Sequence, residues 1–334
     1  MSVKKNQKPK ELNIQNSFIN KFKDVLPASV GLAEELADVL ELSIDSAYRR
    51  IRGETELTIE EVYKLTKKYA ISVDDVFSNR SDTVTFSYTK LTDSAQNFEI
   101  YLNRLYDHLK LISKFENKTI CYVAEEIPIF YSFYSKKLTE FKLFYWQRSV
   151  LNIAEYQQQK FDWGVIPDNL IEAAQASFKE YLNIPSVEIW TLETVLTNIK
   201  QVHFYFDSGV ISKEHALEVL HENKKMIEMV LRNAENGRKN ISDKTETFQL
   251  YSSEVVLGTN CIYITMGETK YSYITFNTLN SLTTNNPEFC EETEHWMHNL
   301  KRKSTLISGV AEKQRNQFFS KIFKVIDESI ASIK

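Results

Sequence analysis

The chain has 334 residues, of which 43% are hydrophobic and 12% aromatic, as in a folded protein rather than a disordered one. This length allows two or three domains, and the formal net charge of −4 argues against a protein that coats nucleic acid. No apolar run approaches the roughly 20 residues of a membrane span, and the first residues lack the apolar segment of a signal peptide. We therefore expect a cytoplasmic protein with no membrane partner.

Residues 1–16 are predicted to form a disordered basic arm. Its positive charges are Lys4, Lys5, Lys8 and Lys10. Such an arm either touches phosphates or only increases solubility. Residues 1–80 contain 13 Lys and Arg and 13 Asp and Glu, so DNA binding by this part of the chain would depend strongly on dimerisation.

Short helices separated by tight turns are predicted from Ser29 to Phe77. Before them, Ser17 is expected to cap a helix that Pro27 stops. The next predicted helix has one apolar face, formed by Leu32, Leu36, Val39 and Leu40. Ser43 then stands at an N-cap position, and Gly53 closes the helix that follows.

The helix from 43 to 52 carries the candidate functional residues. Its apolar side chains recur at helical spacing and share one stripe, which consists of Ile44, Ala47, Tyr48 and Ile51. Arginine can bind guanine or phosphate, and short polar residues allow close approach to a major groove. The candidate DNA-binding residues on the opposite face and at its flanks are Ser43, Asp45, Ser46, Arg49, Arg50 and Arg52. The alternative is the solvated face of an ordinary surface helix.

Two further helix starts follow. Thr58 and Glu61 form a capping box, and Ser72 is expected to cap a short helix with Asp74 and Asp75 in its first turn. With these, the chain from about Ser17 to Phe77 resembles the lambda-repressor-like family of helix-turn-helix domains, also called the XRE family. The most telling parts are the helix ending in Arg52-Gly53 and the sequence ISVDDVF.

The resemblance implies a five-helix domain over residues 17–78 that reads double-stranded DNA, as in a transcriptional regulator. Two departures leave its geometry open. The family usually has a small residue, often glycine, where this chain has Glu41, so the turn could be longer or differently shaped. The family also often has an apolar residue near the position of Arg50, whereas the apolar residue in this chain is Ile51. The rotation of the helix about its axis is therefore open by about one residue.

The polar segment 78–83 marks a first boundary, after which Val84, Phe86 and Tyr88 alternate as in a strand. A helix is predicted from Ala95 to about Phe115, and a strand or buried turn at 120–123. Further helices are predicted over 168–183, 191–206 and 213–236, the last between a Ser212 cap and Gly237. We therefore expect residues 84–237 to form a helical region.

The densest aromatic stretch lies between residues 127 and 152. Its rings are Phe130, Tyr131, Phe133, Tyr134, Phe141, Phe144, Tyr145 and Trp146. A ligand pocket is one interpretation, and base stacking is another, although few basic residues are interleaved with the rings. Helix packing in a core is favoured, because aromatic residues at helical spacing are usually buried.

The polar segment 238–247 marks a second boundary. After it come three β-branched and aromatic runs, FQLYSS, CIYITM and YSYITF, the last two joined as a hairpin at Gly267-Glu268. Helices are predicted over 288–301 and 312–333. The expected fold class is therefore mainly α, with residues 247–334 as a small α+β domain for dimerisation or sensing.

Motifs for catalysis are absent: there is no phosphate-binding glycine loop, nucleophile elbow or HExxH helix. Glu294, His295 and His298 have metal-like spacing, but an amphipathic packing helix is the favoured interpretation. His215 and His221 are six residues apart and face different ways. The three cysteines, Cys121, Cys261 and Cys290, have no paired spacing. We expect no cofactor, no metal and no enzymatic activity.

Together these patterns predict a homodimeric transcriptional regulator whose helix 43–52 enters the major groove. Residues 84–334 would pair the protomers and respond to an unidentified small-molecule or protein effector. The competing hypothesis is a protein-interaction module that keeps the helix-turn-helix fold without reading DNA.

Overall fold

The computed structural model describes residues 14–26, 30–69, 71, 73, 83–92, 94–240 and 246–333. The chain divides into two units, Met1–Thr85 and Phe86–Lys334. Each unit has a hydrophobic core formed by its own side chains. Within the described ranges, no helix is both long enough and apolar enough to cross a membrane.

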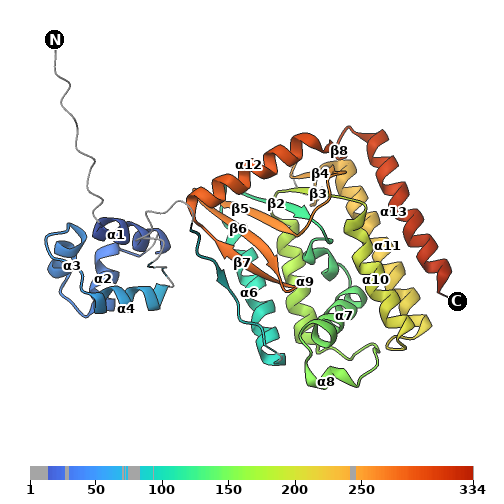
Figure 1. The fold of residues 1–334 in the computed structure, drawn as a ribbon, viewed down its shortest axis with the longest axis horizontal. Coiled ribbons are helices and arrows are strands. Elements are labelled where there is room, and N and C mark those ends of the chain that lie inside the picture. The colour runs from blue at the N-terminus through green and yellow to red at the C-terminus, as the bar shows by residue number, and fades with distance from the viewer. Residues whose placement is uncertain are drawn as a thin grey trace, which may run out of the picture. The chain divides into compact units, whose positions relative to one another are not determined.

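The described part of the first unit is helical (Figure 1). Its helices are α1 (Ile14–Val25), α2 (Leu32–Leu40), α3 (Ile44–Ile51) and α4 (Ile59–Tyr69). All four helices contribute buried side chains to the core, among them Phe18, Phe22, Leu36, Leu40, Ala47 and Leu65. The spacing of these side chains follows the helical period, as the sequence predicted.

Some predictions for this unit are wrong or fall outside what the structure describes. The predicted Ser17 cap is wrong, because α1 begins at Ile14 and Ser17 lies inside it. For the same reason residues 14–16 belong to a helix and not to a disordered arm. Residues 1–13 of that arm, the stop at Pro27, and Ser72 with Asp74 and Asp75 lie outside the described residues.

The second unit combines helices with one sheet. Its strands are β1 (Ser87–Tyr88), β2 (Lys118–Ala124), β3 (Ser186–Trp190), β4 (Phe248–Ser252), β5 (Cys261–Met266), β6 (Thr269–Phe276), β7 (Asn280–Thr284) and β8 (Thr305–Leu306). Its longer helices are α6 (Ala95–Ser113), α7 (Lys136–Tyr145), α9 (Asp168–Leu182), α10 (Glu193–Asp207), α11 (Lys213–Asn236), α12 (Pro287–Lys303) and α13 (Glu312–Ser332). Three short helical turns complete it: η1 (Ile129–Phe133), the π-helical turn η2 (Trp146–Val150) and α8 (Ala154–Gln157).

The strands form a single mixed sheet in the order β1-β7-β6-β5-β2-β3-β4-β8. Strands β2, β3 and β4 are parallel, and the remaining neighbours are antiparallel. Helix α12 packs on one face, where Met297 and Leu300 meet side chains of β2, β3 and β5. The other face packs against α6, α9 and α11 in the main core (Figure 1).

The sheet corrects the predicted domain organisation. Strand β5 pairs with β2, and β4 pairs with β3, so strands β2 and β3 from 84–237 lie between strands from 247–334 in one sheet. Residues 84–237 and 247–334 are therefore not separate domains. The physical reason is that β2 and β3 need partners on both edges to satisfy their backbone N–H and C=O groups, and the later strands supply them.

Local signals in this unit are mostly confirmed. Helix α11 begins at the Ser212 cap, whose hydroxyl accepts the His215 N–H, and ends at Gly237 with φ +63°. The β5–β6 hairpin turns at Gly267, as predicted. Strands β3 and β7 were not predicted. Both are short, β7 does not alternate between polar and apolar residues, and the polar residues Ser186 and Glu188 of β3 are buried.

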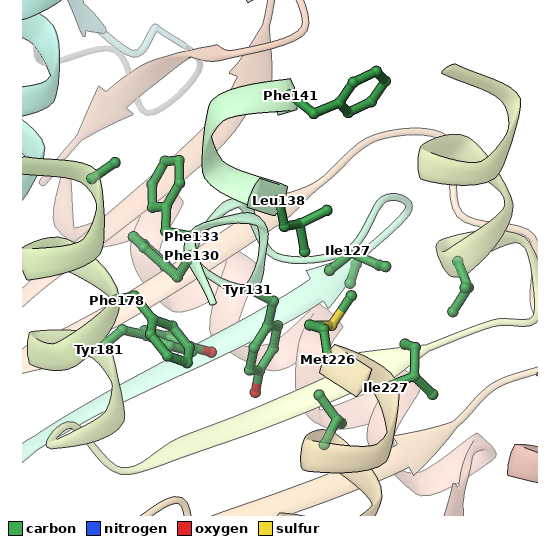
Figure 2. Close-up of a cluster of buried hydrophobic side chains, with 14 of the residues drawn as sticks. Ile127, Phe130, Tyr131, Phe133, Leu138, Phe141, Phe178, Tyr181, Met226 and Ile227 are labelled. Carbon is green, nitrogen blue, oxygen red and sulfur yellow. The ribbon is translucent and has the colours of Figure 1, made fainter. Parts of the chain in front are cut away.

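The aromatic stretch is core. Six of its rings are buried: Phe130, Tyr131, Phe133, Phe141, Phe144 and Trp146. Figure 2 shows Tyr131 between Tyr181 of α9 and Met226 of α11. The hydroxyls of Tyr131 and Tyr181 both donate to the fully buried carboxylate of Glu188 on β3, at 2.8 and 2.6 Å. These contacts hold η1 and α9 on the sheet.

Candidate nucleic-acid interface

Two helix ends fix the position of α3 in the first unit. Ser43 has extended backbone angles, and its Oγ accepts the Ser46 N–H at 3.2 Å, which confirms the predicted N-cap. Between α2 and α3, Glu41 adopts the left-handed conformation, with φ 57° and ψ 45°. Glu41 thus takes the backbone angles that glycine adopts most easily, and the turn stays short.

The rotation of α3 differs from the predicted one. Ala47 is fully buried and Ile51 is half-buried, but Ile44 and Tyr48 are 45% and 44% exposed. The predicted apolar stripe is therefore wrong for Ile44 and Tyr48. Helix α3 is short and lies at the edge of a small core, so only one side of the stripe finds apolar neighbours.

Arg50 does not lie on the outward face, where the sequence analysis placed it. Its guanidinium donates from Nη2 to Glu61 Oε1 at 2.7 Å and from Nε to Glu61 Oε2 at 3.1 Å. The two side chains are only 14% and 15% exposed. Arg50 therefore connects α3 to α4 inside the unit. The predicted outward position of Arg50 is therefore wrong. Its partner Glu61 lies on another helix, and only folding brings the two side chains together.

Glu61 also closes the predicted capping box of α4. Its carboxylate accepts the Thr58 N–H at 3.0 Å, and the Thr58 hydroxyl accepts the Glu61 N–H at 3.2 Å. Burial raises the pKa of the Glu61 carboxyl, but the hydrogen bonds from Arg50 and Thr58 outweigh it, so this pKa lies below its ordinary value. One carboxylate thus supports both the start of α4 and the orientation of α3.

A second clamp comes from Gln15 on α1. Its Nε2 donates to the carbonyls of Arg50 and Thr55 at 2.8 Å, and its Oε1 accepts the Leu57 N–H at 2.9 Å. The side chain thereby fixes the loop between α3 and α4. Gln15 was not predicted as a site residue, because a glutamine in the first turn of a helix gives no sign in the sequence of its distant partners.

The exposed residues of α3 are Ile44, Asp45, Tyr48 and Arg49, with the exposed Ser43 at its N-cap and Arg52 at its C-cap. Arg52 forms an ion pair with Glu54 at 2.7 Å, and both side chains are about half exposed. Among the described residues, Arg49 has no ion-pair partner. Ser46 is half-buried, and its hydroxyl accepts a hydrogen bond from Ser43 at 2.9 Å.

This surface combines guanidinium groups, an aromatic hydroxyl and a carboxylate on one short helix. We name it the α3 face: Ser43, Asp45, Tyr48, Arg49 and Arg52. Tyr48 was missed as a site residue because its spacing matched the apolar stripe. Arg49 and Arg52 can donate to phosphate or to guanine, and Tyr48 can donate a hydrogen bond or pack on a sugar.

The remaining candidate sites from the sequence are the group around Glu294 and the cysteines. Glu294 accepts hydrogen bonds from Tyr263 at 2.9 Å and from Lys270 at 2.8 Å. No group of three His, Cys, Asp or Glu side chains within the described ranges could hold a metal ion. Burial raises the pKa of the Cys121 thiol to about 12 and that of Cys261 to about 11, which makes both poor nucleophiles at neutral pH.

The comparisons with known proteins concern mainly the first unit. A family model described as the BetR domain matches residues 28–104, which include α2, α3 and α4 and the first half of α6. No curated protein and no solved structure matches the chain. The matched segment contains the whole α3 face.

Proposed function

We propose that the chain is a sequence-specific DNA-binding regulator of transcription, with the lambda-repressor-like unit as its reader. The observation that carries the proposal is the α3 face: two exposed arginines on a short helix whose buried side is fixed by Arg50, Glu61 and Gln15. A recognition helix must be held rigidly while its outer side chains stay accessible, and α3 meets both conditions.

In this proposal α3 enters the major groove. Arg49 and Arg52 contact bases or phosphates. Asp45 contributes to sequence selectivity, because its carboxylate accepts a hydrogen bond from cytosine N4 and repels a phosphate. DNA binding requires Arg52 to leave Glu54 or to contact Glu54 and the DNA together. The loss of this ion pair costs little free energy, because both groups are already solvated. A single helix buries too little surface for specific recognition, so two copies bind a two-fold operator and the second unit pairs them.

The decisive experiment is selection of duplex fragments by the full chain, followed by binding at several salt concentrations. A DNA reader retains particular fragments, and its affinity falls steeply with salt as counterions are released. Arg49→Ala should weaken binding to a selected fragment by about 1–3 kcal/mol. The matched control is Lys324→Ala, which removes one exposed positive charge from the second unit and should leave binding unchanged.

A protein-interaction module is the second candidate, favoured by the exposed apolar residues on α4. Ile59 is 84% exposed and Tyr63 is 60% exposed, which is unusual for large apolar side chains. Under this alternative, the protein would have no affinity for random duplex DNA even at low salt. Ile59→Asp, and not Arg49→Ala, would then remove binding to the protein partner.

A further inference from the structure

The second unit contains a cavity of ≈ 430 Å³ between α6 and the sheet face opposite α12. Two polar contacts join residues of its lining: the Tyr101 hydroxyl donates to the Leu279 carbonyl at 2.7 Å, and the Tyr273 hydroxyl lies 3.2 Å from His108 Nε2. The volume lies within the range of pockets that hold small organic ligands. A ligand pocket was one interpretation of the aromatic stretch that contains Phe144, but Phe144 does not line this cavity.

The walls are largely apolar. Strands β2, β5 and β6 present the side chains that alternate onto this face, and α6 covers them. Two rings of the aromatic stretch, Phe130 and Trp146, complete the lining. Both rings are buried in the core and also border the cavity. Part of the aromatic stretch therefore packs in the core and lines the pocket as well.

One buried cation lies in this apolar wall. Lys142 on α7 is 5% exposed, and its Nζ donates to Asn198 Oδ1 and to Gln201 Oε1, each at 2.8 Å. Both partners are neutral amides. No carboxylate among the described residues lies within ion-pair distance of Lys142, so the ammonium has no counter-ion there. The ammonium also contacts the ring of Trp146, whose centre lies 5.5 Å from Nζ and which also lines the cavity.

Burial lowers the pKa of Lys142 to about 8, although Glu126 partly opposes the shift. The amine is therefore still mostly protonated at neutral pH. A buried charge with only neutral partners is costly, and an anion at the same site would relieve that cost.

The remaining titratable side chains of the lining favour an anion as well. Arg104 is exposed and adds a second positive charge, while Glu126 is the single carboxylate among the lining residues that the structure describes. Burial lowers the pKa of His108, so its imidazole is neutral at pH 7. Among the described lining residues, two cations and one anion thus border a largely apolar space.

We propose that this cavity binds an amphipathic monocarboxylate, whose carboxylate pairs with Lys142 and whose apolar body lies against β2, β5 and α6. A ligand amine would be repelled by Lys142, and an alcohol would leave the ammonium without a counter-ion. The proposal concerns the second unit alone and stands whether or not the first unit reads DNA.

The test uses the full chain without DNA and three probes of equal chain length: decanoate, decanol and decylamine. Isothermal titration calorimetry at pH 7 gives the affinities, with decanoate and decylamine below their micelle concentrations and decanol below its solubility limit. Decanoate should bind one per chain, at least about tenfold more tightly than decanol, because the charge-assisted hydrogen bond is lost in the alcohol. Decylamine should bind most weakly. Equal affinities for the three probes, or no binding of decanoate, would overturn the proposal.

Two variants locate the site. Lys142→Met keeps an unbranched side chain one atom shorter and removes its charge, so decanoate should lose about tenfold in affinity while decanol keeps its own. The control is Lys270→Met, since Lys270 pairs with Glu294 on the opposite face of the sheet and its loss should leave decanoate binding intact. Unchanged decanoate affinity in Lys142→Met sinks the assignment.

If circular dichroism shows that Lys142→Met does not fold, Leu105→Trp replaces it. Leu105 on α6 is half-buried and lines the cavity, so a larger ring there fills the space and leaves the exposed side of α6 unchanged. This variant should abolish binding of both decanoate and decanol. Retained binding in a folded Leu105→Trp variant places the probes elsewhere and contradicts the proposal.

Discussion

The guanidinium of Arg50 on α3 and the carboxylate of Glu61 on α4 form a two-point hydrogen-bonded ion pair, with distances of 2.7 and 3.1 Å. The preceding residue, Arg49, is exposed and has no ion pair among the described residues. Two adjacent arginines on one helix therefore have different roles. Arg50 holds the helix in the unit, and Arg49 is free to contact a partner.

Arg50→Ala should reduce the stability of the first unit by about 1–3 kcal/mol. The variant leaves the carboxylate of Glu61, which is largely shielded from solvent, without its ion-pair partner. Arg49→Ala should leave stability within about 0.5 kcal/mol of the wild type. Thermal unfolding followed by circular dichroism compares the two. Equal melting temperatures for both variants would show that the Arg50–Glu61 pair contributes nothing.

The pair also predicts a pH dependence. Because the folded-state pKa of Glu61 lies below the ordinary value of 4.5, its ionised form stabilises the fold. This contribution is complete above pH 4.5 and is lost as the pH falls through the folded-state pKa. Glu61→Gln should therefore be less stable than the wild type at pH 7, and the difference should shrink in acid. Glu60→Gln, an exposed neighbour in the same helical turn, is the control, and a difference that stays constant with pH would contradict the prediction.

Glu41 offers a stabilising substitution. Its φ of 57° is costly for a residue with a Cβ and costs glycine little. Glu41→Gly should raise the free energy of unfolding by about 0.5–1 kcal/mol, after allowance for the greater freedom of glycine in the unfolded chain. Glu41→Ala keeps the Cβ and should give no such gain. Denaturant titration measures both, and a destabilised Glu41→Gly would show that the Glu41 side chain stabilises the turn.

Phe144 tests the packing role of the aromatic stretch. Its ring is fully buried and lies 5.4 Å from that of Phe161 and 5.9 Å from that of Tyr205, centroid to centroid. Phe144→Ala should cost about 3–5 kcal/mol by leaving a void. Because Phe144 lies outside the lining of the cavity, decanoate affinity of the folded variant should match that of the wild type. A small loss of stability would mean that the core collapses around the missing ring.

The division of the chain predicts that residues 84–334 fold without the first unit. The single sheet and its core lie within Phe86–Lys334. A chain starting at Thr83 should be folded by circular dichroism and, under the proposed function, dimeric by light scattering. If it is monomeric while the full chain is dimeric, the dimer contact belongs to the first unit.

The sequence by itself determined the local features of this protein. Ser43, Thr58 with Glu61, and Ser212 with Gly237 mark helix ends, because a cap is formed by residues three or four apart in the chain. Helical periodicity likewise located α2, α6 and α11, and the β5–β6 hairpin follows from the turn at Gly267.

The tertiary structure alone decided which surfaces meet. Pairing of β2 with β5 and of β3 with β4 joins segments more than 50 residues apart, and no local pattern records such partners. The same holds for Arg50, whose role depends on Glu61, and for Lys142, whose lack of a counter-ion depends on α10 supplying amides. Local order follows from short-range hydrogen bonds and periodicity, whereas the roles of charged side chains follow from neighbours that only folding brings together.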